Sequence, residues 1–308
     1  MIAKLIGPVT GTTLALLLTS VPLQAAVVFE TTSPYHHIRV VDESDGSRML
    51  SFDTTRESRV FVRDPLTGHF QYTEFFHMPW LWNLEIKTAL LIGLGGASTH
   101  RAFQHYYPDT KIDAVELDAA VVKVAKDYFF LEESPTLKVH VEDGRVFLRR
   151  SKEVYDLIVL DAYSSGRYGS SLPYHLVTKE FFKSASDHLS PNGVLAYNVI
   201  GTVADWKADI VSAVYATMTN VFPQAYLFTA TESLNVVLIA TKTPEKFNYT
   251  KLNDQVSVLT QRRSPALALY RSGLRQFRGV PPPAAATSPV LTDDFAPIDG
   301  LLNTVPKR

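Results

Sequence analysis

Leu91-Ile92-Gly93-Leu94-Gly95-Gly96-Ala97-Ser98 reads as a buried strand that runs into a glycine-rich turn and then into a helix. Glycine lets the backbone approach a ligand closely, and the first N–H groups of a helix have no partner inside the helix. Glu116 supports a binding role, because an acid about 20 positions after the glycines can accept hydrogen bonds from ribose hydroxyls. We therefore predict a nucleoside-binding turn at Gly93, Gly95 and Gly96. The alternatives are glycines required by packing alone and a Glu116 that caps a helix, which Asp118 could also do.

Around this turn, short apolar runs alternate with helix-like stretches. Strands separated by helices of this length form βαβ units, whose parallel sheet is covered by helices on both faces. We predict an α/β fold with a Rossmann-like sheet closed by strands at Ala225–Phe228 and Asn235–Thr241, an arrangement that resembles the sheet of S-adenosylmethionine-dependent methyltransferases. The other predicted strands are Ala89–Ile92, Ile112–Val115, Leu137–Val141, Leu157–Leu160 and Val194–Tyr197, and the predicted helices are Ser98–Tyr107, Ala119–Phe129, Gly144–Arg150 and Thr178–Leu189.

The chain before Lys87 shows the alternation of strands instead. Ile38–Val41, Arg48–Phe52 and Val60–Val62 are separated by turn-like residues and predict a small antiparallel β domain over residues 27–84. The Rossmann-like catalytic domain is expected over residues 85–245. Residues 246–308 are expected to form a helix and an extended tail, because Pro281-Pro282-Pro283 cannot continue a helix.

Residues 1–26 resemble a secretory signal peptide. Lys4 precedes an apolar stretch from about Leu5 to Leu18, and the segment ends in Ala25-Ala26. We predict an exported protein, periplasmic or secreted. An uncleaved segment would act as a membrane anchor, although it is short for a spanning helix, which needs about 20 residues. The alternative is a cytoplasmic protein with an N-terminal helix.

The composition points to a small-molecule partner. The 308 residues are 46% hydrophobic, and the formal net charge of −1 comes without basic runs, which argues against nucleic acid. The absence of cysteine excludes disulfides, thiolate metal sites and cysteine nucleophiles. The nine histidines are scattered, so no metal site is predicted.

Two more acids end strands on the same edge of the predicted sheet. Asp143 follows one predicted strand and Asp161 follows the next. Open α/β sheets bind ligands outside the carboxyl ends of their strands, so both acids are expected near the glycine turn. Asp143 can accept a hydrogen bond from an adenine amino group there, and the N–H of Gly144 can reach a ring nitrogen.

Taken in order, these motifs resemble the spermidine synthase (polyamine aminopropyltransferase) family, and more closely its divergent bacterial spermidine synthase-like branch. The resemblance covers about residues 33–242, and Leu291–Pro297 is also typical of the divergent branch. The motifs that carry it are Ser33–Val40, Leu50–Asp53, Phe70–Glu74, Gly93–Gly96, Val115–Asp118, Glu142–Gly144, Tyr155–Asp161 and Leu172–Phe182.

The resemblance implies a transferase of polyamine biosynthesis, which moves an aminopropyl group from decarboxylated S-adenosylmethionine to a polyamine or related amine. It places Glu116 on the ribose, Asp143 and Gly144 on the adenine, and Asp161 at the reacting amine as proton acceptor. It also implies a homodimer formed through the N-terminal β unit. The remaining positions that it implies are His36 on the donor side and Tyr72, Thr73, Tyr163 and Ser164 on the amine side.

Several positions depart from the family pattern. Gly96 replaces the acid that holds the donor's aminopropyl amine, and Ser164 replaces the second acid of the catalytic strand. His36 and Thr73 also stand where the family has other polar residues. Loss of two carboxylates should weaken recognition of a dicationic acceptor. Two alternatives therefore stay open: a methyltransferase that uses intact S-adenosylmethionine, and a nucleoside- or polyamine-binding protein without catalysis.

Overall fold

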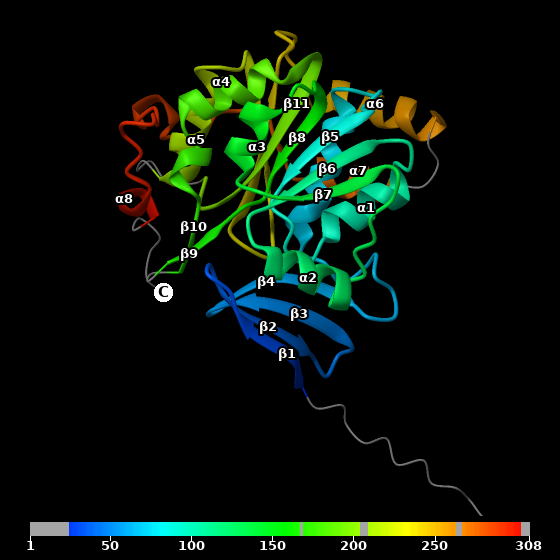
Figure 1. Cartoon of the computed structure of the whole chain (residues 1–308). Coiled ribbons are helices and arrows are strands. Elements are labelled where there is room, and N and C mark those ends of the chain that lie inside the picture. Colours follow the sequence, from blue (N-terminus) through cyan, green and yellow to red (C-terminus); the bar gives the residue numbers. More distant parts are fainter. Residues whose placement is uncertain (1–24, 167–168, 204–208, 263–266, 303–308) are drawn as a thin grey trace, which may run out of the picture.

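The computed structural model describes residues 25–166, 169–203, 209–262 and 267–302. It contains a large mixed sheet flanked by helices and a small antiparallel sheet beside it (Figure 1). The predicted α/β fold class is confirmed. The predicted signal segment lies outside the described residues, apart from Ala25 and Ala26. Within the described ranges, no helix is both long enough and apolar enough to cross a membrane.

The large sheet has eight strands in the order β14-β12-β13-β11-β8-β5-β6-β7. Strands β5 to β8 and β11 pair in parallel, whereas β13 runs antiparallel to both β11 and β12. This reversal completes the predicted methyltransferase-type sheet. The strands are β5 (Thr88–Ile92), β6 (Lys111–Glu116), β7 (Leu137–Val141), β8 (Tyr155–Leu160), β11 (Leu189–Ile200), β12 (Gln224–Thr229), β13 (Asn235–Thr241) and β14 (Phe277–Arg278).

Each face of this sheet packs against its own group of helices. Alternate residues of β5 separate the faces: Ala89 and Leu91 belong to one apolar core, and Leu90 and Ile92 to the other. The first core includes η1 (Gln71–Leu81), α1 (Ser98–Tyr106), α6 (Tyr249–Arg262) and α7 (Leu267–Leu274). The second includes α3 (Gly144–Arg150), α4 (Lys179–Asp187), α5 (Ile210–Thr219) and the C-terminal α8 (Ile298–Leu302).

The small sheet is a four-stranded meander of β1 (Ala26–Thr32), β2 (His37–Asp42), β3 (Ser47–Phe52) and β4 (Thr55–Phe61). Its apolar face packs on α2 (Ala119–Tyr128), which separates it from the large sheet (Figure 1). Ile38, Val40 and Leu50 meet Val121 and Val124 in this core. The packing fixes β4 next to the glycine-rich turn.

Short elements complete the chain. The hairpin of β9 (Ser164–Gly166) and β10 (Gly169–Ser171) follows β8, and η2 (Tyr174–Leu176) leads into α4. After η3 (Ala285–Thr287) the tail crosses α4 and α5, where the backbone of Leu291 bonds to Lys179 and to the Thr217 hydroxyl. This course brings the last described residues to the carboxyl edge of the sheet.

Gly93 makes the turn after β5 sterically feasible. Its φ is +99°, and a Cβ atom there would lie 2.1 Å from the carbonyl oxygen of Asp161. The two segments touch because the Asp161 N–H donates to the Ile92 carbonyl over 2.9 Å. Any side chain at position 93 would separate β5 from β8.

We expect Gly93→Ala to destabilise the fold by about 2 kcal/mol or more, because the left-handed conformation costs roughly 1–3 kcal/mol before the clash is counted. Gly46→Ala is the matched control: Gly46 has a φ of +82° but no atom within 4 Å of its added Cβ. Urea unfolding of both variants would measure the difference. Equal losses of stability would show that the contact with Asp161 is unimportant.

Candidate active site

A cavity of about 1150 Å³ lies at the carboxyl ends of the parallel strands, between the small sheet and the C-terminal tail. It brings together segments from most of the chain, from Pro34 to Gly300. Gly96 and Thr73 are the predicted site residues that do not line it. Those that do are His36, Tyr72, Gly93, Gly95, Glu116, Asp143, Gly144, Asp161, Tyr163 and Ser164.

Glu116 ends β6 and faces the cavity beside the glycine turn. Its carboxylate accepts hydrogen bonds from the N–H groups of Leu94 and Asp118, both over 3.0 Å. Burial raises the pKa of Glu116, although these backbone bonds oppose the shift. Asp118 caps α2 by accepting from the N–H of Ala120 over 2.8 Å. Asp118, and not Glu116, is therefore the residue that caps α2. Glu116 instead holds the glycine turn through the N–H of Leu94 and lines the cavity.

Asp143 lies where α3 begins and has two structural partners. One carboxylate oxygen caps the helix by accepting from the N–H of Val146 over 2.9 Å, and the other lies 2.9 Å from His175 Nε2. The hydrogen bond with His175 lowers the pKa of Asp143. Sequence reasoning missed His175, although it stands inside the motif Leu172–Phe182. A ligand amino group at Asp143 would share the carboxylate with this ring.

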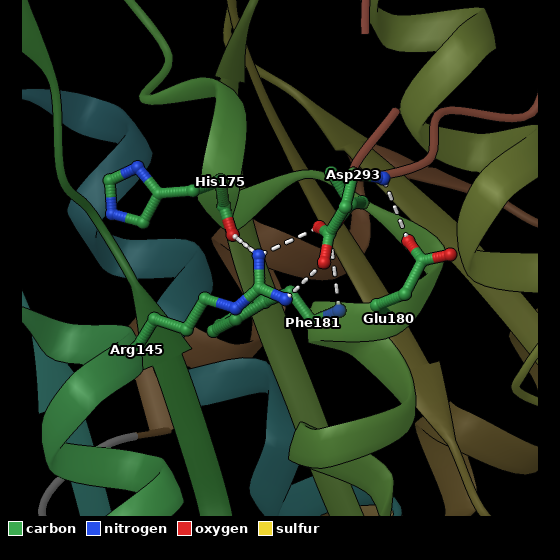
Figure 2. Close-up of polar contacts among 6 residues, drawn as sticks. Arg145, His175, Glu180, Phe181 and Asp293 are labelled. Carbon is green, nitrogen blue, oxygen red and sulfur yellow. Dashed lines mark hydrogen bonds and ion pairs between the residues drawn. The ribbon is translucent and has the colours of Figure 1, made fainter. Parts of the chain in front are cut away.

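Arg145 joins the segment around His175, which lines the cavity, to the C-terminal tail (Figure 2). Its guanidinium makes two parallel bonds to Asp293, of 2.7 and 2.6 Å, and a third to the carbonyl of His175 over 3.1 Å. The N–H of Asp293 donates to Glu180 over 3.0 Å, and the Thr178 hydroxyl donates to the Asp293 carboxylate over 2.7 Å. We call the paired bonds between Arg145 and Asp293 the clamp. The tail beyond the clamp, from Ala296 to Gly300, lines the cavity.

Asp161 follows β8 and is half-buried in the opposite part of the cavity. Its carboxylate accepts from the Tyr72 hydroxyl over 3.1 Å and from Asn198 Nδ2 over 2.9 Å. Asn235 holds Asn198 through a 3.0 Å bond to its amide oxygen. Burial raises the pKa of Asp161 to about 6 against these two hydrogen bonds, and the negative charge of Glu57 adds to the increase.

The phenols around Asp161 stay neutral. Burial raises the pKa of Tyr72 and of Tyr163 well above the usual value. Tyr72 can therefore donate to the carboxylate, and Tyr163 donates to the carbonyl of Asn198 over 2.9 Å. Both tyrosines are predicted from the sequence, but Asn198 is not, because it lies within a long buried strand and has no motif of its own.

The other predicted residues occupy distinct places. His36 stacks on Phe52 with ring centroids 4.3 Å apart and lines the cavity. Ser164 is exposed at its rim. The Thr73 hydroxyl donates to the carbonyl of Phe70 over 2.9 Å. Gly96 lies outside the cavity because its N–H donates to the Ser58 hydroxyl over 2.8 Å.

Comparison with known proteins agrees with this architecture. The polyamine aminopropyltransferase of Vibrio vulnificus strain CMCP6 is 30% identical over 283 residues, which cover 89% of this chain and 91% of that protein. The fold matches a probable spermidine synthase from Corynebacterium glutamicum, with a TM-score of 0.63, 20% identity and coverage of 77% and 86% of the two chains. It also matches human methyltransferase-like protein 13, solved in complex with SAH, with a TM-score of 0.52, 24% identity and coverage of 68% and 91%.

A family comparison identifies the chain more directly. The spermine/spermidine synthase domain matches residues 69–248, which contain the glycine turn, Glu116, Asp143 and Asp161. This segment contains strands β5 to β13, and the similarity to the Vibrio protein extends over 89% of the chain. The chain therefore belongs to the spermine/spermidine synthase family.

Proposed function

We propose that the protein is an aminopropyltransferase, which moves an aminopropyl group from decarboxylated S-adenosylmethionine to a polyamine or related amine. The observation that carries the proposal is the half-buried Asp161 carboxylate, held by Tyr72 and Asn198 on the cavity wall. Family membership and the name of the Vibrio relative support the reaction class.

The donor nucleoside is expected at the glycine turn. Glu116 would accept hydrogen bonds from the ribose hydroxyls, and Asp143 with the N–H of Gly144 would bind the adenine. These groups lie on one edge of the sheet, where open α/β folds bind nucleotides. The sulfonium of the donor would then point toward Asp161.

The chemistry requires a proton acceptor. An alkylammonium with a pKa near 10.4 must lose a proton at pH 7, which costs about 3 pKa units or about 4–5 kcal/mol. Asp161 accepts this proton, and the amine lone pair attacks the carbon beside the sulfonium. The C–N bond forms as the C–S bond breaks, and the electron pair leaves with sulfur as a neutral thioether. No acid is required for this leaving group, and positioning supplies much of the remaining rate enhancement.

The charge of the cavity wall favours a cationic ligand. Among the described residues that line it, six are acidic, and Arg56 is the single lysine or arginine. A donor that retained its carboxylate would gain less from this wall than a decarboxylated one. The acidic wall therefore supports the decarboxylated donor.

A methyltransferase reaction with intact S-adenosylmethionine is the second candidate. It is favoured by Gly96, which stands at a position where the resemblance implies an acid for the donor amine, and by the related fold of human methyltransferase-like protein 13. Analysis of the released nucleoside separates the two. Aminopropyl transfer yields methylthioadenosine, and methyl transfer yields S-adenosylhomocysteine.

We also propose that residues 1–26 direct export or anchor the chain in a membrane, and that the protein forms a homodimer through its small sheet. The signal-like pattern of residues 1–26 supports the first proposal, and the family resemblance supports the second. Cell fractionation and light scattering would test them respectively.

Substitutions at Asp161 and at Glu116 should affect turnover and nucleoside affinity separately. We expect Asp161→Asn to abolish methylthioadenosine release while leaving nucleoside affinity unchanged, because the amide cannot accept the proton. We expect Glu116→Gln to weaken nucleoside affinity about tenfold or more, the usual effect of losing a hydrogen bond to a charged group. Calorimetry and product analysis measure the two effects, and each variant is the control for the other. Undiminished turnover in Asp161→Asn would show that another group is the base.

The pH dependence follows from the raised pKa of Asp161. Because Asp161 must be ionised to accept the proton, kcat/KM should rise with pH through an inflection near 6. Tyr72→Phe removes a hydrogen bond that stabilises the carboxylate, so the inflection should move to higher pH. Tyr249→Phe, on an exposed residue of α6 away from the cavity, should leave it in place. An inflection that does not move in Tyr72→Phe would contradict this assignment.

A further inference from the structure

A second, small cavity of about 20 Å³ adjoins the main one beside Asp161. Glu57, Tyr72 and Asp161 line both cavities, whereas His100 and Ser98, from the first turn of α1, line only the small one. We call this small cavity the annex. A volume of this size holds a single water-sized group.

His100 brings a buried ring to the annex wall. Its side chain is 3% exposed, and neither ring nitrogen has a hydrogen-bond partner among the described residues. Burial lowers the pKa of His100 to about 3, so the ring is neutral near pH 7 and offers one N–H donor and one acceptor lone pair. Buried polar groups are normally hydrogen-bonded, which leaves this ring in need of a partner from within the annex.

Glu57 supplies negative charge at the same place. The Thr55 hydroxyl donates to its carboxylate, and its charge contributes to the raised pKa of both Asp161 and Tyr72. Arg59 is the one lysine or arginine on the annex wall among the residues that the structure describes, and it is directed elsewhere, because it pairs with Asp45 over 3.1 Å and stacks on Phe61. The annex therefore combines two carboxylates, those of Glu57 and Asp161, with a neutral acceptor.

Strand β4, which carries Glu57, also explains why no acidic side chain stands at Gly96 in the glycine turn. A Cβ atom at Gly96 would lie 2.7 Å from Ser58 Cβ and 2.9 Å from Phe129 Cδ1, so no side chain fits there without rearrangement. Ser58 occupies that space and accepts the Gly96 N–H. Its neighbour on β4 is Glu57. A carboxylate is thus available from β4 where the turn cannot provide one.

We propose that the annex binds a primary ammonium group of an amine-bearing substrate, with Glu57 as its counter-ion and His100 as a neutral hydrogen-bond acceptor. The proposal rests on the aminopropyltransferase function. A primary ammonium is water-sized and donates three hydrogen bonds, and Asp161 lies on the same wall. The group belongs either to the aminopropyl end of the donor or to the far end of a diamine acceptor.

The first test uses Glu57→Gln in the otherwise unchanged chain. Calorimetry would compare decarboxylated S-adenosylmethionine with methylthioadenosine, which lacks the amine, and steady-state assays would give KM for 1,4-diaminobutane. A loss of about ten- to a hundredfold in affinity for the donor, with methylthioadenosine unchanged, assigns the annex to the donor. A rise of the same size in KM for the diamine, with donor affinity unchanged, assigns it to the acceptor. Glu153→Gln, on an exposed residue outside both cavities, should change neither.

The second test uses His100→Leu, which separates a binding role from a structural one. Replacing a buried, unpartnered polar ring by an apolar side chain should raise the thermal midpoint while weakening the same amine-bearing ligand by about tenfold. A lower midpoint with unchanged affinity would indicate a packing role only and would overturn the part assigned to His100.

The outcomes also separate this proposal from the proposed function. A wild-type chain that releases methylthioadenosine, with amine affinities unchanged in both variants, contradicts the annex alone. A wild-type chain that binds methylthioadenosine and decarboxylated S-adenosylmethionine equally, and releases no product, contradicts both.

Discussion

The contact between the backbones at Gly93 and Asp161 is the constraint on which the site depends. It joins the ends of β5 and β8, because the Asp161 N–H bonds to Ile92 and the absent Cβ of Gly93 leaves room for the Asp161 carbonyl. The glycine-rich turn and the proposed base are therefore adjacent in space although 68 positions separate Gly93 and Asp161 in the chain. Only backbone atoms make this contact, so it does not depend on the identity of the Asp161 side chain.

Electrostatics then adapts Asp161 to its proposed task. Burial alone would favour the protonated acid, and donation from Tyr72 and Asn198 limits that effect. A pKa of about 6 leaves the carboxylate largely ionised at neutral pH while making it a better proton acceptor than an exposed aspartate. The two neighbouring tyrosines stay neutral at pH 7 and supply no phenolate base, because their own pKa values lie far above 7. The single ionisable acceptor within this group of hydrogen bonds is therefore Asp161.

The sequence predicted the parts of the fold that repeat a local pattern. The parallel strands and their helices follow from apolar runs of the right length, and Gly93, Glu116, Asp143 and Asp161 follow from the rule that such sheets bind ligands at their carboxyl edge. The first strand of the small sheet and helix α5 went unpredicted. β1 is largely exposed, and α5 is buried on nearly every side, so neither shows the periodicity of a half-buried element.

The site residues that the sequence did not reveal depend on distant contacts. Glu57 lies on β4 and reaches the cavity only because α2 positions the small sheet. His100 reads as one of several scattered histidines until the fold buries it beside Asp161. The placement of Gly96 outside the cavity likewise depends on Ser58, which is 38 residues away in the chain. Such pairs carry no local signal, because a single sequence does not show which strand covers which turn.

The two ends of the described chain close the cavity from opposite sides. His36 comes from the turn before β2, and Ala296–Gly300 come from the tail, which Arg145 and Asp293 hold against the segment around His175. An ion pair that is partly exposed adds little stability, but two parallel bonds fix direction well. The same clamp places His175, whose carbonyl bonds to Arg145 and whose ring bonds to Asp143. The tail, the helix that starts at Asp143 and the segment around His175 are thus linked through one arginine, so this side of the cavity is complete only when the tail has docked.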